Sequence, residues 1–444
     1  MSVSIKLSDE SGSENETGAT IKDVANSNNN GLKNNAVLGE SNEMFVDVSA
    51  LLQDGEQVDI ANGESAGVRN TRANSRTAGR LVALDAARGL AVIGMYLQHF
   101  SSNETISAIV SGNTTLLFVL CGGISYSIMA QRMKDRETET TAFRARMLAR
   151  AVFIDVIGYL LILLNTPYGV ILPAYAAMFV LALVLVRRST RVLVTTAAVL
   201  AVVAPPLMIL GLSALSGAYP LYDIAGGPMS ALALAPTFVT GMAIGRLDLT
   251  KVRTALSLAG GGGIMLAVGK MLSAFVIPGL SRSFEAWLIG LQGTVSAVPT
   301  MPTMPDPNAI WPLNTEPPLW NMLLSTSPHS ASTFQTLIGL GVAFLVLGLV
   351  CLVPKKSSVV LMPFAAVGRV ALTMYAAQFV VIWSLELAGI EYSVGGIPFG
   401  DLLVAAATLL TGWLIARLPN GPLESLMRHF DRAFSASRTV PSSR

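Results

Sequence analysis

Ten apolar stretches, each close to the length of a membrane span, follow one another between residues 83 and 416. A transmembrane helix needs about 20 mostly apolar residues, because it must cross roughly 30 Å of hydrocarbon. Only 13% of the 444 residues are charged, whereas a soluble domain carries about 25%. The sequence therefore predicts an all-α, polytopic membrane bundle of about ten transmembrane helices. The stretches are residues 83–100, 113–131, 147–165, 169–186, 192–213, 229–246, 255–277, 333–353, 366–386 and 398–416.

The basic residues between these stretches fall almost entirely on one side of the predicted bundle. The loops that share a side with the N-terminus hold 23 Lys and Arg, and the opposite loops hold one, Arg282. Because cytoplasmic loops carry the excess of Lys and Arg, we expect both termini in the cytoplasm. Residues 421–444 are then a basic cytoplasmic tail. The orientation also places the long loop 278–332 outside the cell.

Residues 1–75 differ in composition from the rest of the chain. The first 67 residues carry 12 acidic and 3 basic residues and are rich in Asn and Ser. A segment of this kind cannot bury enough apolar surface to offset the entropy lost on ordering. We therefore expect a disordered cytoplasmic tail over residues 1–75 and a transmembrane domain over residues 76–420.

Ionisable residues stand at both ends of the first apolar stretch, RLVALDAARGLAVIGMYLQHF (80–100). At 100° per residue, Arg88 and His99 project from the same helix face as Asp85. This face should point into the bundle, because an unpaired charge in lipid is costly. Asp85 and Arg88 are spaced to pair, and an arginine that snorkels to the cytoplasm beside a balancing acid explains them without a function.

Two histidines are predicted to lie on the outer side of the membrane. His99 ends the first stretch, and His329 precedes the eighth in STSPHSAST. Imidazole is the commonest general base, so this side is a candidate catalytic site. The alternatives are a contact of His99 with headgroups and a helix-capping role for the segment around His329. Trp311 and Trp320 in the outer loop either lie at headgroup level or line a ligand cleft.

Further polar residues are predicted near the cytoplasmic end. Asp155 lies in the third stretch, and Arg369 opens the ninth. With Asp85 and Arg88 they form either an ion-paired network or, through the two arginines, a phosphate-binding site. The sequence shows no metal-ligand spacing and no Ser-His-Asp order. The basic loops are explained by topology, so nucleic acid is not an expected partner.

The first stretch resembles the YeiB-like bacterial membrane proteins, which are relatives of heparan-alpha-glucosaminide N-acetyltransferase. Their first helix reads roughly R-x-x-x-L-D-x-x-R-G-x-A-x-x-G-M. Similar stretches are SGNTTLLFVLCGGISYSIM (111–129), FVTGMAIGRLDL (238–249), SPHSASTFQTLIGLGVAFLVLG (327–348), VGRVALTMYAAQ (367–378) and GPLESLMR (421–428). The resemblance covers residues 80 to 430.

The resemblance implies transfer of an acetyl group from cytoplasmic acetyl-CoA to an acceptor on the far side of the membrane. The acceptor would be a cell-envelope glycan or glycolipid. His99 matches the family's catalytic histidine, and Asp85 and Arg88 match its first-helix pair. With Arg369 they would bind the CoA nucleotide, while His329, Trp311 and Trp320 would contact the acceptor.

A transporter or flippase for a small metabolite or envelope lipid is the alternative function, because intramembrane charge also marks substrate paths. No inverted repeat is visible to support it. The expected location is a bacterial plasma membrane, as a multi-pass protein. The oligomeric state is left open, with a homodimer as one option.

Overall fold

The computed structural model divides the chain into two compact units, Met1–Gly79 and Arg80–Arg444. Each unit is described here by itself. The described residues are 2–7, 12–16, 39–41, 44–46, 58–60, 67–135, 140–215, 218, 221–292, 318–418 and 420–436. Trp311 and most of the outer loop therefore lie outside the described residues.

The first unit contains five short strands in one sheet, in the order β2-β1-β5-β3-β4. Their bounds are Ser2–Leu7 for β1, Gly12–Glu16 for β2, Gly39–Ser41 for β3, Met44–Val46 for β4 and Val58–Ile60 for β5. Composition predicts no strands there. The structure differs because Val3, Ile5 and Leu7 alternate with polar residues, which is the period of a strand. The segments between the strands are not described, so the disorder of the tail stays a prediction.

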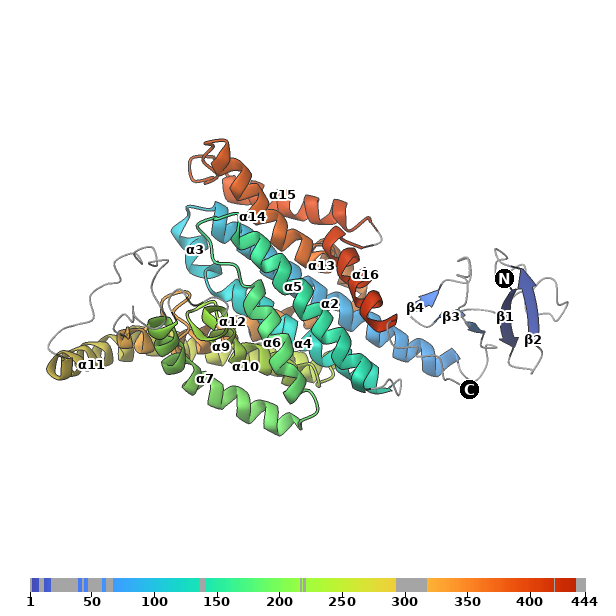
Figure 1. The fold of residues 1–444 in the computed structure, drawn as a ribbon, viewed down its shortest axis with the longest axis horizontal. Helices are drawn as coiled ribbons and strands as arrows, with labels where there is room; N and C mark the ends of the chain where they lie inside the picture. The colour runs from blue at the N-terminus through green and yellow to red at the C-terminus, as the bar shows by residue number, and fades with distance from the viewer. Residues whose placement is uncertain are drawn as a thin grey trace. The chain divides into compact units, whose positions relative to one another are not determined.

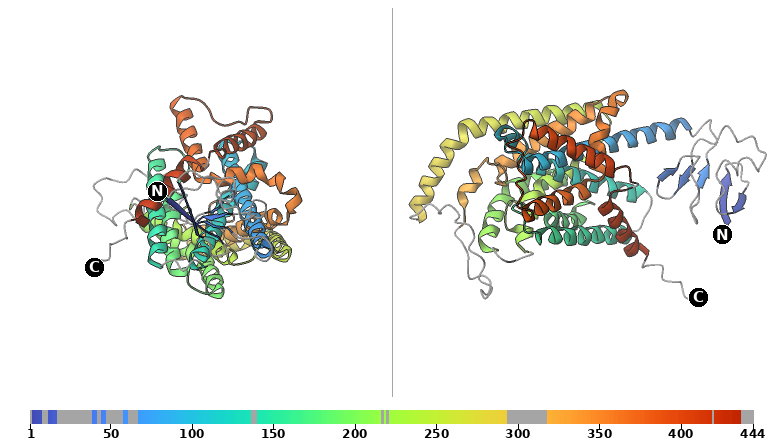
Figure 2. Two further views of the ribbon diagram at one scale, coloured as in Figure 1. Left: turned by 90° about the vertical axis from the view of Figure 1, so that its right-hand side faces the viewer. Right: turned by 90° about the horizontal axis from the view of Figure 1, so that it is seen from above.

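The second unit is helical wherever its described residues form regular structure (Figure 1). The helices before the outer loop are α2 (Gly67–Phe100), α3 (Glu104–Val110), α4 (Asn113–Asp135), α5 (Thr140–Ile162), α6 (Leu172–Leu185), α7 (Thr190–Ala214), α8 (Leu221–Ala225), α9 (Ala231–Ile244), α10 (Val252–Met271), the π-turn η2 (Leu272–Val276) and α11 (Ile277–Gln292). After the loop come η3 (Trp320–Leu324), α12 (Thr333–Leu352), η4 (Lys355–Leu361), α13 (Met362–Arg369), α14 (Ala371–Leu387), α15 (Gly400–Ile415) and α16 (Pro422–Ala436). The helix α10 continues through η2 into α11 as one long, curved element (Figure 2).

Four described helices are long and apolar enough to cross a membrane. They are Glu104–Gln131, which joins α3 to most of α4, Thr190–Ala214 (α7), Val252–Gly290, which joins α10, η2 and most of α11, and Thr333–Leu352 (α12). A fifth candidate is the pair Lys356–Arg369 and Ala371–Leu387, which is bent by 66° at its break. The helices α6, α9 and α15 are apolar but shorter. The membrane class is thus supported, whereas the count of about ten spans stays a prediction.

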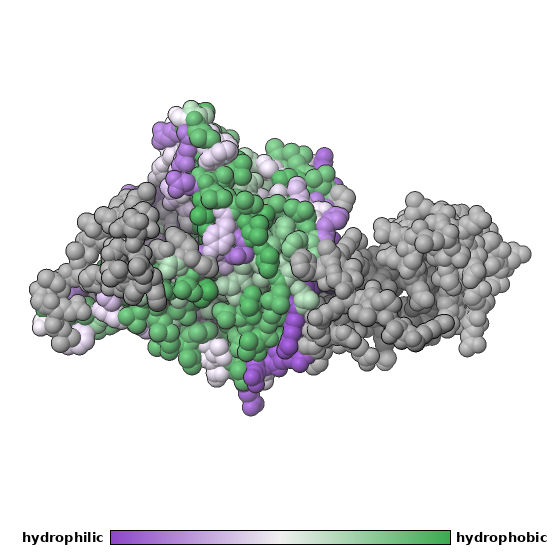
Figure 3. All heavy atoms as spheres, viewed as in Figure 1, coloured by the Kyte–Doolittle hydropathy of each residue, from purple (hydrophilic) through white to green (hydrophobic). Residues whose placement is uncertain are grey.

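The outer surface of the second unit is largely apolar. Leu163, Val184 and Phe275 are 78%, 68% and 80% exposed, and apolar side chains cover most of the visible described face (Figure 3). A soluble monomer rarely exposes contiguous apolar area of this extent. A lipid environment accounts for it.

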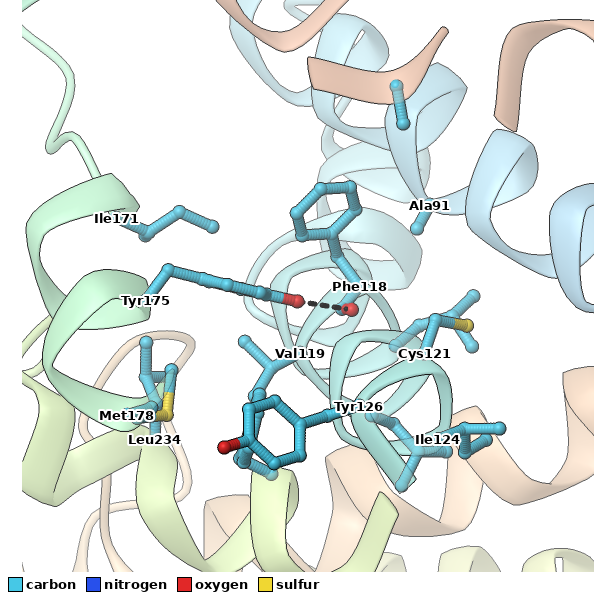
Figure 4. Packing of buried hydrophobic residues seen from close by; sticks show 14 of the residues in the cluster. Ala91, Phe118, Val119, Cys121, Ile124, Tyr126, Ile171, Tyr175, Met178 and Leu234 are labelled. Atoms are coloured by element: carbon cyan, nitrogen blue, oxygen red, sulfur yellow. Dashed lines mark hydrogen bonds between the residues drawn. The ribbon is translucent and has the colours of Figure 1, made fainter. Parts of the chain in front are cut away.

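The core of the second unit is built from large aromatic side chains between α4, α6 and α9. Tyr126 and Phe238 are almost completely buried, and their rings lie 6.0 Å apart. The buried Tyr175 hydroxyl donates a hydrogen bond of 2.8 Å to the Phe118 carbonyl oxygen (Figure 4). A buried phenol needs such a partner, since an unpaired hydroxyl costs about 1–3 kcal/mol. The core is therefore tightly packed, and its buried Tyr126 and Tyr175 hydroxyls are hydrogen-bonded.

The helix α2 packs against α13 and runs in the same direction as α14. Gly89 packs against the backbone of Phe364, and Gly368 packs against the Asp85 carbonyl oxygen, so closely that neither glycine has room for a Cβ atom. Farther along, the Tyr96 hydroxyl donates a hydrogen bond of 2.9 Å to the Met374 carbonyl oxygen. Two segments about 280 residues apart in sequence are therefore joined along most of their length.

Candidate functional site

A cavity of about 270 Å³ lies where α2, α4 and α14 meet the loops before α6 and α12. The helix α2 contributes its C-terminal end to the cavity, as its charged and polar face predicts. The polar side chains that line the cavity come from five separate segments of the chain. They are Gln98, His99, Thr115, Tyr168, His329, Tyr375 and Gln378. The structure therefore brings His99 and His329 to one site, as the sequence predicts.

The position of His99 is fixed by two aromatic rings. The Tyr168 ring stacks on the imidazole with centroids 3.9 Å apart, and the Phe379 ring meets it edge-on at 6.0 Å. The Tyr168 hydroxyl also donates a hydrogen bond of 2.9 Å to the His99 carbonyl oxygen. A ring held on both sides presents its nitrogen atoms in a defined direction, which a positioned general base requires.

His329 reaches the same cavity from a strained loop. Its φ angle is 58° and that of Ala331 is 52°, and the left-handed region is uncommon for residues other than glycine. His329 Nε2 lies 3.0 Å from the Gln98 amide nitrogen. With the amide donating, Nε2 accepts and the proton resides on Nδ1. Burial lowers the pKa of His329, so the neutral ring is favoured.

The helix cap predicted for the segment around His329 is present and is made by Ser332. The Ser332 hydroxyl accepts a hydrogen bond of 3.0 Å from the Gln335 backbone N–H and caps α12. His329 makes no contact of this kind. Its strained backbone thus serves to direct the side chain into the cavity, which is typical of functional sites.

Four buried polar atoms of the cavity have no hydrogen-bond partner within the protein. They are His99 Nδ1, Gln98 Oε1, Gln378 Nε2 and Gln378 Oε1. Buried polar groups are paired in the large majority of cases, and each unpaired one costs about 1–3 kcal/mol. Four such atoms facing one cavity indicate a site for a polar ligand that satisfies them.

About three turns before His99 on α2, Arg88 is held by the protein itself. Its guanidinium donates hydrogen bonds to Asp85 Oδ1 at 3.0 Å and to Ser125 Oγ at 2.6 Å. A third bond of 3.3 Å reaches the Gly368 carbonyl oxygen. Arg369, by contrast, is exposed at the break between α13 and α14. The pairing of Asp85 with Arg88 is confirmed. Arg369 is an exposed cation near this pair.

Glu424 of α16 contacts the start of α14, just after Arg369. Its carboxylate accepts hydrogen bonds from the backbone N–H groups of Leu372 and Thr373, at 2.8 and 3.1 Å. These amides open α14, so the acid neutralises the positive end of that helix. The stretches VGRVALTMYAAQ and GPLESLMR, which the resemblance groups together, are therefore in direct contact.

Two predicted residues stand apart from the cavity. Asp155 on α5 interacts with Asp223 of α8, so it does not join Asp85 and Arg88. Trp320 packs beside Met208 and Ala331 and is not among the lining residues of the cavity. Its place as an acceptor contact stays a prediction, as does that of Trp311.

Three further residues that line the cavity were not predicted from the sequence: Gln98, Gln378 and Tyr168. The signal for both glutamines was a polar amide within an apolar stretch, which a membrane helix tolerates only where it faces the bundle. Gln378 closes the TMYAAQ motif and is 1% exposed. Tyr168 lies in a loop, and nothing in the sequence shows that its ring covers His99.

Residues 307–432 match a family model described as Protein of unknown function (DUF418). The match covers less than a third of the chain. It includes His329, Arg369, Gln378 and Glu424, but it begins long after α2 and so does not include His99. No curated protein matches the chain.

Proposed function

We propose that the protein is a membrane acetyltransferase, which moves acetyl from cytoplasmic acetyl-CoA to a glycan or glycolipid acceptor outside a bacterial plasma membrane. The observation that supports it is the cavity at His99, with its four unpaired polar atoms. It lies at the C-terminal end of α2, and the Asp85–Arg88 pair lies about three turns earlier on the same helix, beside the exposed Arg369. One helix thus joins a site for an anionic donor to a site for base catalysis.

The direction of the helices supports the ten-span arrangement. Arg88 contacts Gly368, Tyr96 contacts Met374 and His99 contacts Phe379. This order makes α2 parallel to α14, as helices one and nine of the predicted series should be. The pairs Gly262 with Gly341 and Gly348 with Ala255 make α10 antiparallel to α12, as for helices seven and eight. An alternating series with both termini in the cytoplasm has this pattern.

The donor site rests on Arg369 more than on Arg88. The nucleotide of CoA carries phosphates, which a guanidinium binds through paired hydrogen bonds. Arg88 already donates hydrogen bonds to Asp85, Ser125 and Gly368. A phosphate that bound Arg88 would have to replace these bonds. Arg369 is exposed, and its charge stands at the start of α14. Arg88 then shapes the site and Arg369 binds.

The cavity can carry out acetyl transfer with its own groups. The unpaired His99 Nδ1 accepts the proton of an acceptor hydroxyl or amine as its oxygen or nitrogen attacks the thioester carbonyl. The amide N–H groups of Gln378 can stabilise the negative oxygen that forms. The C–S bond then breaks, and the imidazolium returns its proton to the departing CoA thiolate. Attack by His99 itself, followed by transfer from an acetyl-enzyme, uses the same residues.

The second candidate is a transporter or flippase. The observation that favours it is the 66° break between α13 and α14, because broken helices often form substrate sites in transporters. Gln378 in the cavity follows that break. The two functions differ in whether a covalent change occurs.

Acetyl transfer separates the two functions. Full-length protein in nanodiscs is incubated with radiolabelled acetyl-CoA and envelope glycolipids, and the label on the lipid is measured. We expect transfer by the wild-type protein and a loss of about 10²–10⁴-fold in His99→Ala. Stabilisation by acetyl-CoA should persist in this variant, since the nucleotide binds beside Arg369, about three turns away along α2. Neither stabilisation nor transfer in the wild-type protein would leave the transporter as the better reading.

A further inference from the structure

A second cavity, of about 300 Å³, adjoins the one at His99. It lies between the end of α5, the loop before α6, α8 and the start of α9. The two cavities share three lining residues, Tyr168, Gly169 and Met229. Tyr168 thus stacks on His99 in one cavity and lines the other. A molecule in the second cavity would have one end beside the imidazole.

The second cavity has the polar groups of a sugar site. Its lining includes the Asp223 carboxylate, the Asn165 amide and the Thr166 hydroxyl, together with the Tyr222 ring. A carboxylate accepts hydrogen bonds from two neighbouring hydroxyls, and an aromatic ring packs on the apolar face of a pyranose. The described residues that line it include no Lys, Arg or His.

Asp223 is held in place for such a role. Its Oδ2 accepts a hydrogen bond of 2.7 Å from the Tyr159 hydroxyl, which fixes the carboxylate and leaves Oδ1 toward other donors. Burial raises the pKa of Asp223, and the hydrogen bond from Tyr159 opposes that rise. Asn165 follows the end of α5 with a φ angle of 52°, a left-handed conformation that asparagine often adopts after a helix.

We infer that the second cavity is the acceptor subsite and that it binds a neutral sugar through two adjacent hydroxyls on Asp223. A further hydroxyl of the sugar then passes Gly169 and reaches His99. This inference rests on the proposed acetyltransferase and names its acceptor class. An anionic sugar is excluded because its charge would face a half-buried carboxylate with no cation among the lining residues to offset it.

Gly169 lines both cavities, beside Met229. A Cβ atom there would lie 3.3 Å from the Met229 Cγ atom, and no other atom comes within 4 Å. Because a methionine side chain is flexible, alanine should fit with a small shift. A larger side chain would fill the passage while Asp223 stays accessible.

The test measures sugar binding without acetyl-CoA. The probes are methyl β-D-glucoside and D-glucuronate, observed by saturation-transfer NMR on full-length protein in nanodiscs free of sugar detergents. We expect the neutral glucoside to bind and glucuronate not to bind. Asp223→Asn keeps the shape and an acceptor for Tyr159, and should weaken glucoside binding about 10- to 100-fold, because a hydrogen bond to a charged group is lost. It should also admit glucuronate.

Asp401→Asn is the matched control, because Asp401 is a carboxylate in the first turn of α15 that does not line either cavity. It should leave glucoside binding unchanged. Equal binding of both sugars by the wild-type protein would overturn the inference, as would unchanged glucoside binding in Asp223→Asn. Melting curves check that each variant is folded.

Gly169→Leu keeps the test informative if Asp223→Asn fails to fold. This variant should bind glucoside within about twofold of the wild-type protein but lose acetyl transfer to it; full transfer would refute the passage. The two proposals also separate. Asp223-dependent sugar binding without any acetyl transfer would remove the acetyltransferase and leave the sugar site, whereas transfer with no such binding would remove the acceptor subsite alone.

Discussion

The carboxylate of Glu424 caps α14 through Thr373, accepting hydrogen bonds from its backbone N–H at 3.1 Å and from its hydroxyl at 2.5 Å. The same hydroxyl accepts a bond of 3.1 Å from the Leu423 backbone N–H. The last helix of the protein is therefore tied to the point where α13 and α14 break. This contact fixes the direction in which α14 leaves the break and so the position of Gln378.

Glu424→Ala should destabilise the protein by about 1–2 kcal/mol, because the first amides of α14 lose their cap. Thermal melting in detergent measures the loss. Glu386→Gln, an exposed acid later in α14, is the control and should melt as the wild-type protein does. An unchanged melting point in Glu424→Ala would mean that solvent replaces the cap at no cost.

Arg369→Ala should weaken CoA binding about 10- to 100-fold, since a charge-assisted contact is worth about 1.5–3 kcal/mol. Its melting point without ligand should change little, because the side chain is exposed. Titration with CoA followed by calorimetry measures the affinity. Binding unchanged by this substitution would take Arg369 out of the donor site.

Arg88→Ala should act mainly on stability. It leaves Asp85 without its partner at 3.0 Å, and breaking a buried ion pair costs about 3 kcal/mol or more. The double variant Asp85→Asn with Arg88→Leu removes both charges and should recover part of this loss. A normal melting point with weakened CoA binding in Arg88→Ala would instead place Arg88 in direct contact with phosphate.

Stability should fall on acidification because of His329. Its pKa in the folded protein is lowered by burial, so below about pH 6.5 the unfolded state binds a proton that the folded state resists. The contribution of His329 to the free energy of unfolding is constant above that pH. Below it, the ring destabilises the folded protein more and more as the pH falls. His329→Gln should lose less melting temperature between pH 7.5 and 5.5 than the wild-type protein. Identical slopes would show that the ring is readily protonated in the fold.

The topology can be tested with reporter fusions. The asymmetry of 23 basic residues against one predicts that residue 140 lies in the cytoplasm and residue 305 outside, since short basic loops stay inside. An alkaline phosphatase fusion should be active at 305 and inactive at 140. Equal activity at both positions would rule out the predicted orientation.

Much of the second unit could be predicted from its sequence. Most of the apolar stretches match described helices to within a few residues, and the spacing of Asp85 and Arg88 gives their ion pair, because both follow from local periodicity. The ninth stretch, residues 366–386, differs because the structure breaks it between α13 and α14. The sequence could not show that Tyr168 covers His99 or that Glu424 caps α14. These contacts join distant segments, and only the packing of the whole bundle brings them together.

Composition alone did not predict the strands of the first unit. The acidic, Asn-rich segment as a whole predicts a chain without order, but the alternation at Val3, Ile5 and Leu7 is a local pattern that an average hides. Composition describes what a segment can bury, whereas alternation describes how a few residues can pair.

The pairing of α2 with α14 sets an order on synthesis. Tyr96 and Met374, which share a hydrogen bond, are 278 residues apart, and translation at about 5–20 residues per second separates their appearance by roughly 14 to 56 s. For that interval α2 is in the membrane with its polar face unpartnered. A membrane chaperone or an early helix such as α4 has to shield Asp85 and His99 until the last third of the chain is inserted. The cavity at His99 can therefore be completed only near the end of translation.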